Sequence, residues 1–212
     1  NMISNSGIRP LIRSSSQRER NTKSGDTDKL KEFPGGSLKI GVANHGALRN
    51  FSVKYGFIDD SENMKRASEK DGDLENLILT RFQSFGKSKK AFFISTPQLE
   101  DESNILPIYL KGDQRKFHVP CQCCGEKIEL KWECVSELDE TKCGIIYDLD
   151  EDNRLIPGTT RYRCQKCNGE FTDRNKKQML IDGEWIPTAK PKIEGYVSYQ
   201  ISSLYAPVYM DG

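Results

Sequence analysis

The chain has 212 residues, enough for one or two domains of about 150 residues each. Hydrophobic residues make up 35% and charged residues 30%, so the chain is globular in composition but poor in core-forming side chains. Lysine and arginine (32) balance aspartate and glutamate (31), which excludes a strong overall field toward nucleic acid or membrane and restricts any basic surface to a local one. The sequence has no run of about 18 apolar residues and no apolar block near residue 1, so we expect neither a membrane protein nor a secreted precursor.

Residues 1–32 are polar and basic, with seven lysines and arginines against four acids. This composition predicts a basic flexible arm with one short helix over residues 8–13. Three β-rich runs bounded by Gly, Asn or Pro follow, at residues 38–43, 53–58 and 91–95.

An amphipathic pattern between the second and third runs predicts a helix from Leu74 to Phe85, with Asp73 as its N-cap and Gly86 at its end. A strand, a helix and a strand in this order indicate a parallel pair joined by a right-handed crossover. The segment therefore reads as part of an α/β domain.

Polar residues follow each predicted strand of this domain. Asp59 and Asp60 follow the second run, Ser95-Thr96-Pro97 closes the third, and Asn44-His45-Gly46 closes the first. Ligands bind at the carboxyl edge of α/β sheets, where one acid can hold Mg²⁺ through water while the next orients an attacking water. Taken alone, two aspartates after a strand are also compatible with an ordinary turn.

Four of the seven cysteines form two Cys-x-x-Cys turns, Cys121/Cys124 and Cys164/Cys167. Each turn can aim two sulfurs at one point, and the following Gly125 or Asn168-Gly169 tolerates the left-handed backbone that such a turn needs. The sequence therefore predicts a closed, structural Zn²⁺ site within a small β zinc ribbon.

Alternative ligands and pairings stay open at this point. Disulfides or a redox motif could also explain the two turns, and Cys123 or His118 could replace one of the four ligands. We expect Cys134 and Cys143 to be ordinary buried or free thiols. An acidic tip at residues 150–153, between two apolar runs, predicts a hairpin inserted in the ribbon.

Gly86-Lys87-Ser88 resembles the end of a P-loop, but the leading glycine position is Arg81. The order is also reversed, because a helix pattern precedes the triplet and a strand follows it. We therefore reject a P-loop here.

Taken in order, these segments resemble the large terminase subunits of lambda-like (GpA-type) tailed phages. The resemblance spans roughly residues 8–208, and it is carried by residues 30–38 (LKEFPGGSL), 41–44 (GVAN), 59–60 (DD), 95–97 (STP), 113–115 (DQR), 119–121 (VPC), 164–167 (CQKC), 183–185 (GEW) and 203–207 (SLYAP).

The resemblance implies a DNA-packaging motor whose ATPase, using Mg²⁺ and ATP, moves double-stranded viral DNA into the procapsid. Asp59 aligns with the Walker B aspartate, Asp60 with the family's catalytic glutamate, and Ser95-Thr96-Pro97 with the coupling motif; Arg81 is a candidate nucleotide contact or a plain helix-surface residue. The resemblance also implies a small terminase subunit and a portal or procapsid as partners, a host-cytoplasmic location and no membrane. A separate nuclease domain gives the family its endonuclease activity.

Two motifs of the family are absent from the sequence, the Walker A segment and the nuclease domain, and Asp60 is one methylene shorter than the family's glutamate. We therefore expect a partial P-loop NTPase (RecA-like) sheet plus a zinc ribbon, inactive as an ATPase by itself. The predicted parts are an arm (1–32), a partial ATPase core (33–117), a zinc ribbon (118–175) and a return segment (176–212).

A different class of function competes with this interpretation, namely a non-catalytic zinc-ribbon module that binds nucleic acid or acts as a scaffold. Residues 161–192 hold eight lysines and arginines against four acids. This local excess makes Arg174, Lys176 and Lys177 candidate DNA contacts, although a solvated surface would have the same composition.

Overall fold

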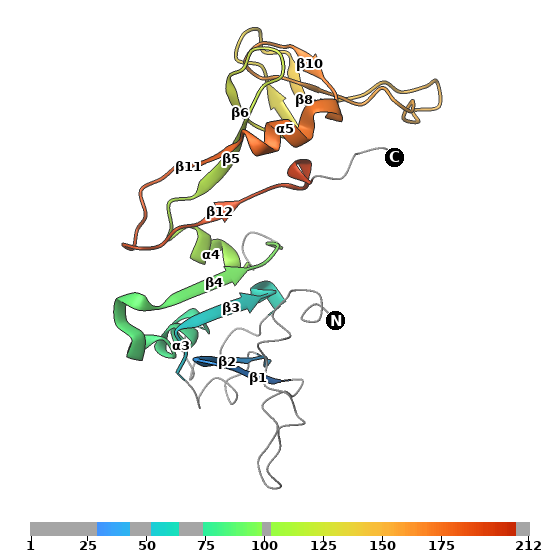
Figure 1. Ribbon diagram of the computed structural model, residues 1–212. Coiled ribbons are helices and arrows are strands. Elements are labelled where there is room, and N and C mark those ends of the chain that lie inside the picture. Colours follow the sequence, from blue (N-terminus) through green and yellow to red (C-terminus); the bar gives the residue numbers. More distant parts are fainter. Residues whose placement is uncertain (1–28, 43–51, 64–73, 99–102, 207–212) are drawn as a thin grey trace. The chain divides into compact units, whose positions relative to one another are not determined.

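The computed structural model describes residues 29–42, 52–63, 74–98 and 103–206 (Figure 1). The chain divides into two compact units, residues 1–96 and 97–212. The predicted helix over 8–13, the Asn44-His45-Gly46 cluster and the predicted N-cap Asp73 lie outside the described residues. Within the described residues, no helix has the length and apolar character needed to cross a bilayer.

The first unit begins with an antiparallel hairpin of β1 (Leu30–Phe33) and β2 (Gly36–Lys39). The predicted strand over 38–43 is therefore displaced, because β2 ends at Lys39. Pro34 and Gly35 explain the difference, since Gly35 takes a φ of 85° and this pair favours a tight turn that returns the chain onto β1.

The parallel strand pair predicted for this unit is confirmed. β3 (Tyr55–Asp59) and β4 (Lys90–Ile94) run parallel in register from Tyr55 opposite Lys90 to Asp59 opposite Ile94. Between them lie η2 (Ser61–Asn63), α3 (Leu74–Thr80) and η3 (Gln83–Ser88). The helix is thus shorter than predicted, and a 3₁₀ segment replaces its last turn.

One face of the β3–β4 pair is buried and the other is exposed. Ile58 of β3, Ile78 of α3 and Phe82, two residues beyond the end of α3, form the buried cluster. Gly56 permits this packing, because a Cβ there would lie 2.4 Å from the Phe82 ring. Phe57, on the opposite face, is 72% exposed and stacks on Phe92 across the pair, with ring centroids 5.1 Å apart.

The second unit contains two small sheets. In the first, β5 (Arg115–Pro120) is the central strand; it pairs antiparallel with β6 (Lys127–Glu129) and β11 (Glu184–Ile186), and parallel with β12 (Tyr199–Gln200). The second is antiparallel in the order β10 (Glu170–Phe171), β9 (Arg161–Arg163), β8 (Lys142–Ile146), β7 (Glu133–Val135).

Short helices complete the second unit: α4 (Ile105–Tyr109), η5 (Asp173–Asn175), α5 (Lys176–Ile181) and η6 (Ser203–Tyr205). The predicted acidic hairpin is seen beyond β8, where Leu149 pairs with Leu155 across the tip (Figure 1). In the return segment that follows α5 and β11, β12 is a strand of only two residues. The fold is therefore mixed α/β, with several small sheets and few helices.

A polar contact fixes β12 beside β5. The Asp113 carboxylate accepts hydrogen bonds from the Ser198 amide (3.1 Å) and from Arg115 Nε (2.8 Å). Burial acts to raise the pKa of Asp113, but these hydrogen bonds outweigh it and hold the pKa below its usual value. Gly112 allows the close approach, because a Cβ there would lie 2.4 Å from Ser198 Oγ.

Candidate functional site

The four predicted ligand cysteines lie in the turns of two β-hairpins. Cys121 and Cys124 lie between β5 and β6, and Cys164 and Cys167 lie between β9 and β10. The two hairpins belong to different sheets, so the cysteines come together only through the packing of those sheets. Tyr162 of β9 belongs to the same buried cluster as Val119 of β5 and Ile128 of β6, which joins the two sheets.

Both turns have the same backbone geometry. The amide of Gly125 donates to Cys121 O (2.9 Å), and the amide of Asn168 donates to Cys164 O (3.0 Å). Gly125 and Asn168 take positive φ values of 77° and 58°. The left-handed backbone predicted after each Cys-x-x-Cys pair is therefore confirmed.

The four sulfurs converge on one point. All four Sγ atoms lie within 4.8 Å of one another, and those of Cys121 and Cys167 are 3.9 Å apart. Tetrahedral coordination at a Zn–S distance of about 2.3 Å would separate neighbouring sulfurs by about 3.8 Å. The four cysteines are thus close enough to hold a metal ion, and four thiolates suit a borderline-soft cation such as Zn²⁺.

Backbone amides surround these sulfurs. Cys121 Sγ accepts a hydrogen bond from the amide two residues later (3.3 Å), Cys164 Sγ accepts one from Lys166 (3.3 Å), and Cys167 Sγ accepts one from Gly169 (3.4 Å). Burial raises the pKa of Cys164 to about 12. A coordinated cation reverses this preference, because a metal-bound thiol is held deprotonated.

The two alternative ligands considered from the sequence, Cys123 and His118, lie outside this group of four sulfurs. Cys123 is exposed, and its Sγ lies 3.7 Å from Glu170 O. His118 lies on β5, with Nδ1 3.2 Å from Lys116 O. Both residues lie near the turns, but neither belongs to the convergent set of four sulfurs.

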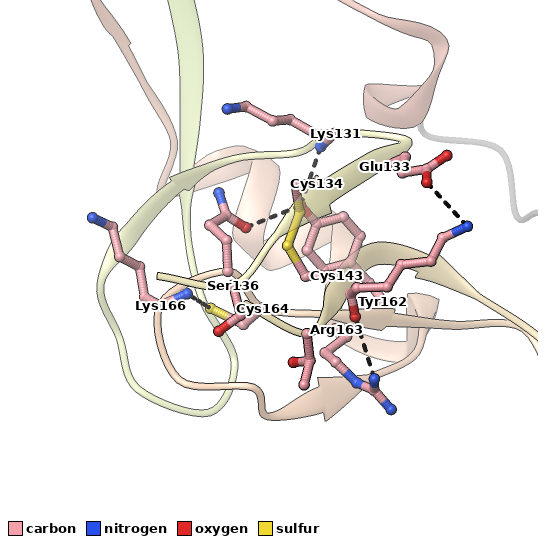
Figure 2. Close-up of a disulfide and its surroundings, with 12 residues drawn as sticks. Lys131, Glu133, Cys134, Ser136, Cys143, Tyr162, Arg163, Cys164 and Lys166 are labelled. Carbon is pink, nitrogen blue, oxygen red and sulfur yellow. Dashed lines mark hydrogen bonds and ion pairs between the residues drawn. A yellow bond between two sulfur atoms is a disulfide. The ribbon is translucent and has the colours of Figure 1, made fainter. Parts of the chain in front are cut away.

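The expectation of free thiols at Cys134 and Cys143 is wrong. They are directly opposite on β7 and β8, with Cα atoms 4.8 Å apart, and their sulfurs form a disulfide (Figure 2). The physical reason is register: residues opposite each other on antiparallel strands bring their Cβ atoms close together. The sequence separation of nine residues does not reveal this pairing without the strand register.

The turn between β7 and β8 contacts the second cysteine turn directly. Asp139 Oδ2 accepts a hydrogen bond from Asn168 Nδ2 (2.8 Å), and Lys166 Nζ pairs with Glu137 (2.5 Å). Hydrogen bonds from the hydroxyl and amide of Thr141, together with the Asn168 bond, lower the pKa of Asp139 to about 2. Sequence analysis missed Asp139; its only local signal is the Asp-x-Thr spacing, which is typical of an Asx turn.

The acids and the serine predicted at the sheet edge lie together at the carboxyl end of β3 and β4. Asp59 ends β3, and Asp60 follows it with a φ of 53°, a backbone conformation unusual for a residue other than glycine. Ser95 directly follows β4, and its Oγ accepts a hydrogen bond from the Glu62 amide (3.0 Å). Asn63 Nδ2 donates to both carboxylate oxygens of Asp60 (3.0 and 2.9 Å).

The other residues predicted to be functional are the rest of the coupling motif, Arg81 and three candidate DNA contacts, and they differ in exposure and in hydrogen-bond partners. Thr96 and Pro97 continue from Ser95, and Arg81 follows α3 with its Nε 3.2 Å from Thr80 Oγ1. Of the three candidate DNA contacts, Arg174 and Lys177 are exposed, whereas Lys176 is buried with its Nζ 3.8 Å from Asp173.

The comparisons with known proteins agree with the resemblance found in the sequence. Residues 1–185 match the family described as phage terminase large subunit gpA, ATPase domain. No curated protein and no solved structure matches the chain significantly. Since the match covers most of the chain, this protein belongs to the phage terminase large subunit gpA ATPase-domain family.

Proposed function

We propose that this chain forms the part of a terminase ATPase domain that carries the Walker B acids and the coupling motif. The observation that carries the proposal is the hydrogen bond between the Glu62 amide and Ser95 Oγ (3.0 Å), which links the acidic end of β3 to the end of β4. In the complete motor, this link would let a change at the nucleotide move the segment that follows β4. The motor would translocate double-stranded viral DNA into a procapsid.

The acidic edge supplies two carboxylates of different function. Asp59 would hold Mg²⁺ through water, and Asp60 would orient the water that attacks the γ-phosphate. The Asp60 carboxylate accepts hydrogen bonds from Asn63, so its position is set by the short η2 segment. Arg81 lies at the opposite end of β3, because its carbonyl accepts a hydrogen bond from the Val53 amide (3.0 Å), so the geometry favours a helix-surface role over a contact to the nucleotide.

Nucleotide binding needs a phosphate-binding loop, and the 212 residues contain no Gly-x-x-x-x-Gly-Lys-Ser/Thr segment. We therefore expect the 212-residue chain to bind Mg-ATP negligibly and to hydrolyse none. A polypeptide that joins such a segment from the same gene region to this chain should hydrolyse ATP.

Substitution of the acids in that longer polypeptide tests the proposal. Asp59→Asn should reduce kcat by at least about a hundredfold, because the substitution removes the carboxylate that would hold Mg²⁺ at the reacting phosphate. Asp152→Asn, on the exposed hairpin tip of the second unit, is the matched control and should leave kcat unchanged. Micromolar Mg-ATP binding by the 212-residue chain, or an active Asp59→Asn variant, would contradict the proposal.

For the four cysteines we propose one structural Zn²⁺ per chain. Metal analysis of the purified protein should give a zinc-to-chain ratio of one, and Cys164→Ser should abolish it. Cys123→Ser is the control, because Cys123 lies outside the convergent set. A folded protein without metal would refute this assignment.

A second candidate function is sequence-independent nucleic-acid binding by the zinc ribbon. It is favoured by the exposure of Arg174 on η5 and Lys177 on α5. Binding that weakens on neutralising these two residues, with no ATPase activity in any longer polypeptide, would favour this module.

Under the leading proposal the partners are a small terminase subunit and the portal of the procapsid, in the host cytoplasm.

A further inference from the structure

Four lysines gather at the amino end of the β3–β4 pair, opposite the acidic edge. Lys54 precedes β3, Lys87 lies in η3, Lys89 follows η3, and Lys90 begins β4. The Lys90 amide donates to Lys54 O (2.9 Å), so the two strands start side by side (Figure 1). We call these four residues the lysine edge.

The fold brings the lysine edge together in two ways. Parallel pairing places the starts of β3 and β4 at one end of the sheet, which brings Lys54 beside Lys90 although they are far apart in sequence. Gly86 then turns the chain within η3 with a φ of 50°, just before Lys87. This turn occupies the connection from α3 to β4, so the triplet that begins at Gly86 is not a P-loop, in agreement with the sequence analysis.

All four lysine side chains are exposed, and among the described residues no ion pair involves them. The two segments that carry them, residues 52–58 and 82–98, contain no aspartate or glutamate. The nearest acids along β3 are Asp59 and Asp60, at the far end of a five-residue strand about 16 Å long. The strand pair is therefore electrically polarised, positive at one end and negative at the other.

Lysine ammonium groups are compact, flexible point charges that contact phosphates without reading base edges. Duplex DNA carries one negative charge per about 1.7 Å of its axis, so a local cluster of four lysines can contact several phosphates at once. Because the overall charge of the chain is only +1, such a local surface is where a polyanion would be attracted.

We propose that the lysine edge is a sequence-independent contact surface for the phosphate backbone of duplex DNA, distinct from the acidic edge. The choice of duplex DNA as the polyanion rests on the proposed function. The contact itself requires neither nucleotide nor hydrolysis, because the lysines lie at the opposite end of the strands from the acids.

The test is a fluorescence-anisotropy titration of a labelled 20-base-pair duplex with the zinc-loaded 212-residue chain at several salt concentrations. Lys87→Gln, Lys89→Gln and Lys90→Gln are combined in one variant. We expect affinity at 50 mM salt to fall at least about tenfold, and the slope of log affinity against log salt to flatten by up to about 2.7, since each phosphate contact contributes about 0.9.

The control variant combines three exposed basic residues of the second unit that are already in ion pairs, Lys127→Gln, Lys142→Gln and Arg154→Gln. It changes the net charge by the same amount, and we expect it to bind duplex DNA nearly as the parent chain does. Matching thermal unfolding of both variants and the parent shows that the folded state is retained; Lys54 is left in place because it lies over the Tyr55 ring.

Several outcomes would overturn the proposal: no duplex binding by the parent chain, equal losses in the two variants, or a loss found only on neutralising Arg174 and Lys177. Stronger binding of single strands than of duplex, or displacement of the duplex by polyglutamate at equal charge, would assign the surface to another class of polyanion. The assay contains no nucleotide, so its failure leaves the ATPase proposal standing, and failure of the ATPase test leaves this surface standing.

Discussion

The hydroxyl of Tyr205 is the point at which the C-terminal segment is fixed to the core of the second unit. It accepts a hydrogen bond from the Leu130 amide (2.7 Å) and donates one to Phe117 O (2.5 Å). The Tyr205 ring is buried and packs edge-on against the Phe117 ring, with centroids 5.5 Å apart. One oxygen thus satisfies two backbone groups that lie 75 and 88 residues away in sequence.

The substitution Tyr205→Phe removes this oxygen and leaves the ring packing in place. A buried polar group left without a partner costs about 1–3 kcal/mol, so the loss of partners for the Leu130 amide and the Phe117 carbonyl should total about 2–6 kcal/mol. Water entering the vacated space would move the value toward the lower end of this range. At a denaturant slope of about 2 kcal/mol/M, the urea midpoint should fall by about 1–3 M.

Equilibrium urea unfolding of the zinc-loaded protein measures this loss. Tyr199→Phe is the matched control, because Tyr199 is 54% exposed and its ring packs on Trp185. The unfolding free energy of this variant should differ from that of the parent by less than about 0.5 kcal/mol. If Tyr205→Phe also changes the free energy by less than about 0.5 kcal/mol, the inference that these two buried backbone groups depend on Tyr205 is refuted.

Three further predictions concern the same unit. Burial raises the pKa of Tyr162 to about 12, so the folded chain keeps a proton that the unfolded chain loses near pH 10. Stability should therefore fall between pH 10 and 12, and Tyr162→Phe should reduce that slope by up to about 1.4 kcal/mol per pH unit in urea titrations. Gly144→Ala should lower Tm more than Gly158→Ala: both glycines have positive φ, but only at position 144 would a Cβ meet backbone atoms, the nearest 2.7 Å away. Asp139→Ala should weaken zinc affinity about tenfold in a chelator competition, because it removes a hydrogen bond that positions the turn of Cys164 and Cys167, whereas an unchanged affinity would show that the turn holds itself.

Local patterns predicted the parts of this molecule that depend on neighbouring residues. The two cysteine turns, their left-handed Gly125 and Asn168, and the parallel strands around α3 follow from spacing, turn chemistry and apolar periodicity. Pro34-Gly35 carries an equally local signal for a hairpin. The partner strand β1 has the polar composition of the N-terminal arm, so the sequence does not reveal that it pairs with the β-rich run after the turn.

Features that depend on distant pairing were not predictable in the same way. The Cys134–Cys143 disulfide depends on the register of β7 on β8. The Asp139–Asn168 hydrogen bond depends on the β7–β8 turn lying beside the β9–β10 turn of the same sheet. The central position of β5, with three neighbours drawn from residues 127 to 200, is likewise set by tertiary pairing. A single sequence carries no local signal for such contacts, because each partner alone would suit many neighbours.

The candidate metal centre and the hydrophobic core of the second unit share the same side chains. Cys121 and Cys164 are counted among its most buried side chains, at 3% and 0% exposure, beside Val119 and Tyr162. A chain with only 35% hydrophobic residues would gain stability by placing thiolates where a richer sequence would place leucine, since a cation bound by the four cysteines would join two turns from different sheets. Without a cation, burial raises the pKa of the Cys164 thiol, so this side chain contributes packing alone. Metal loss should therefore unfold the core around Val119 and Tyr162 and not merely free the two turns.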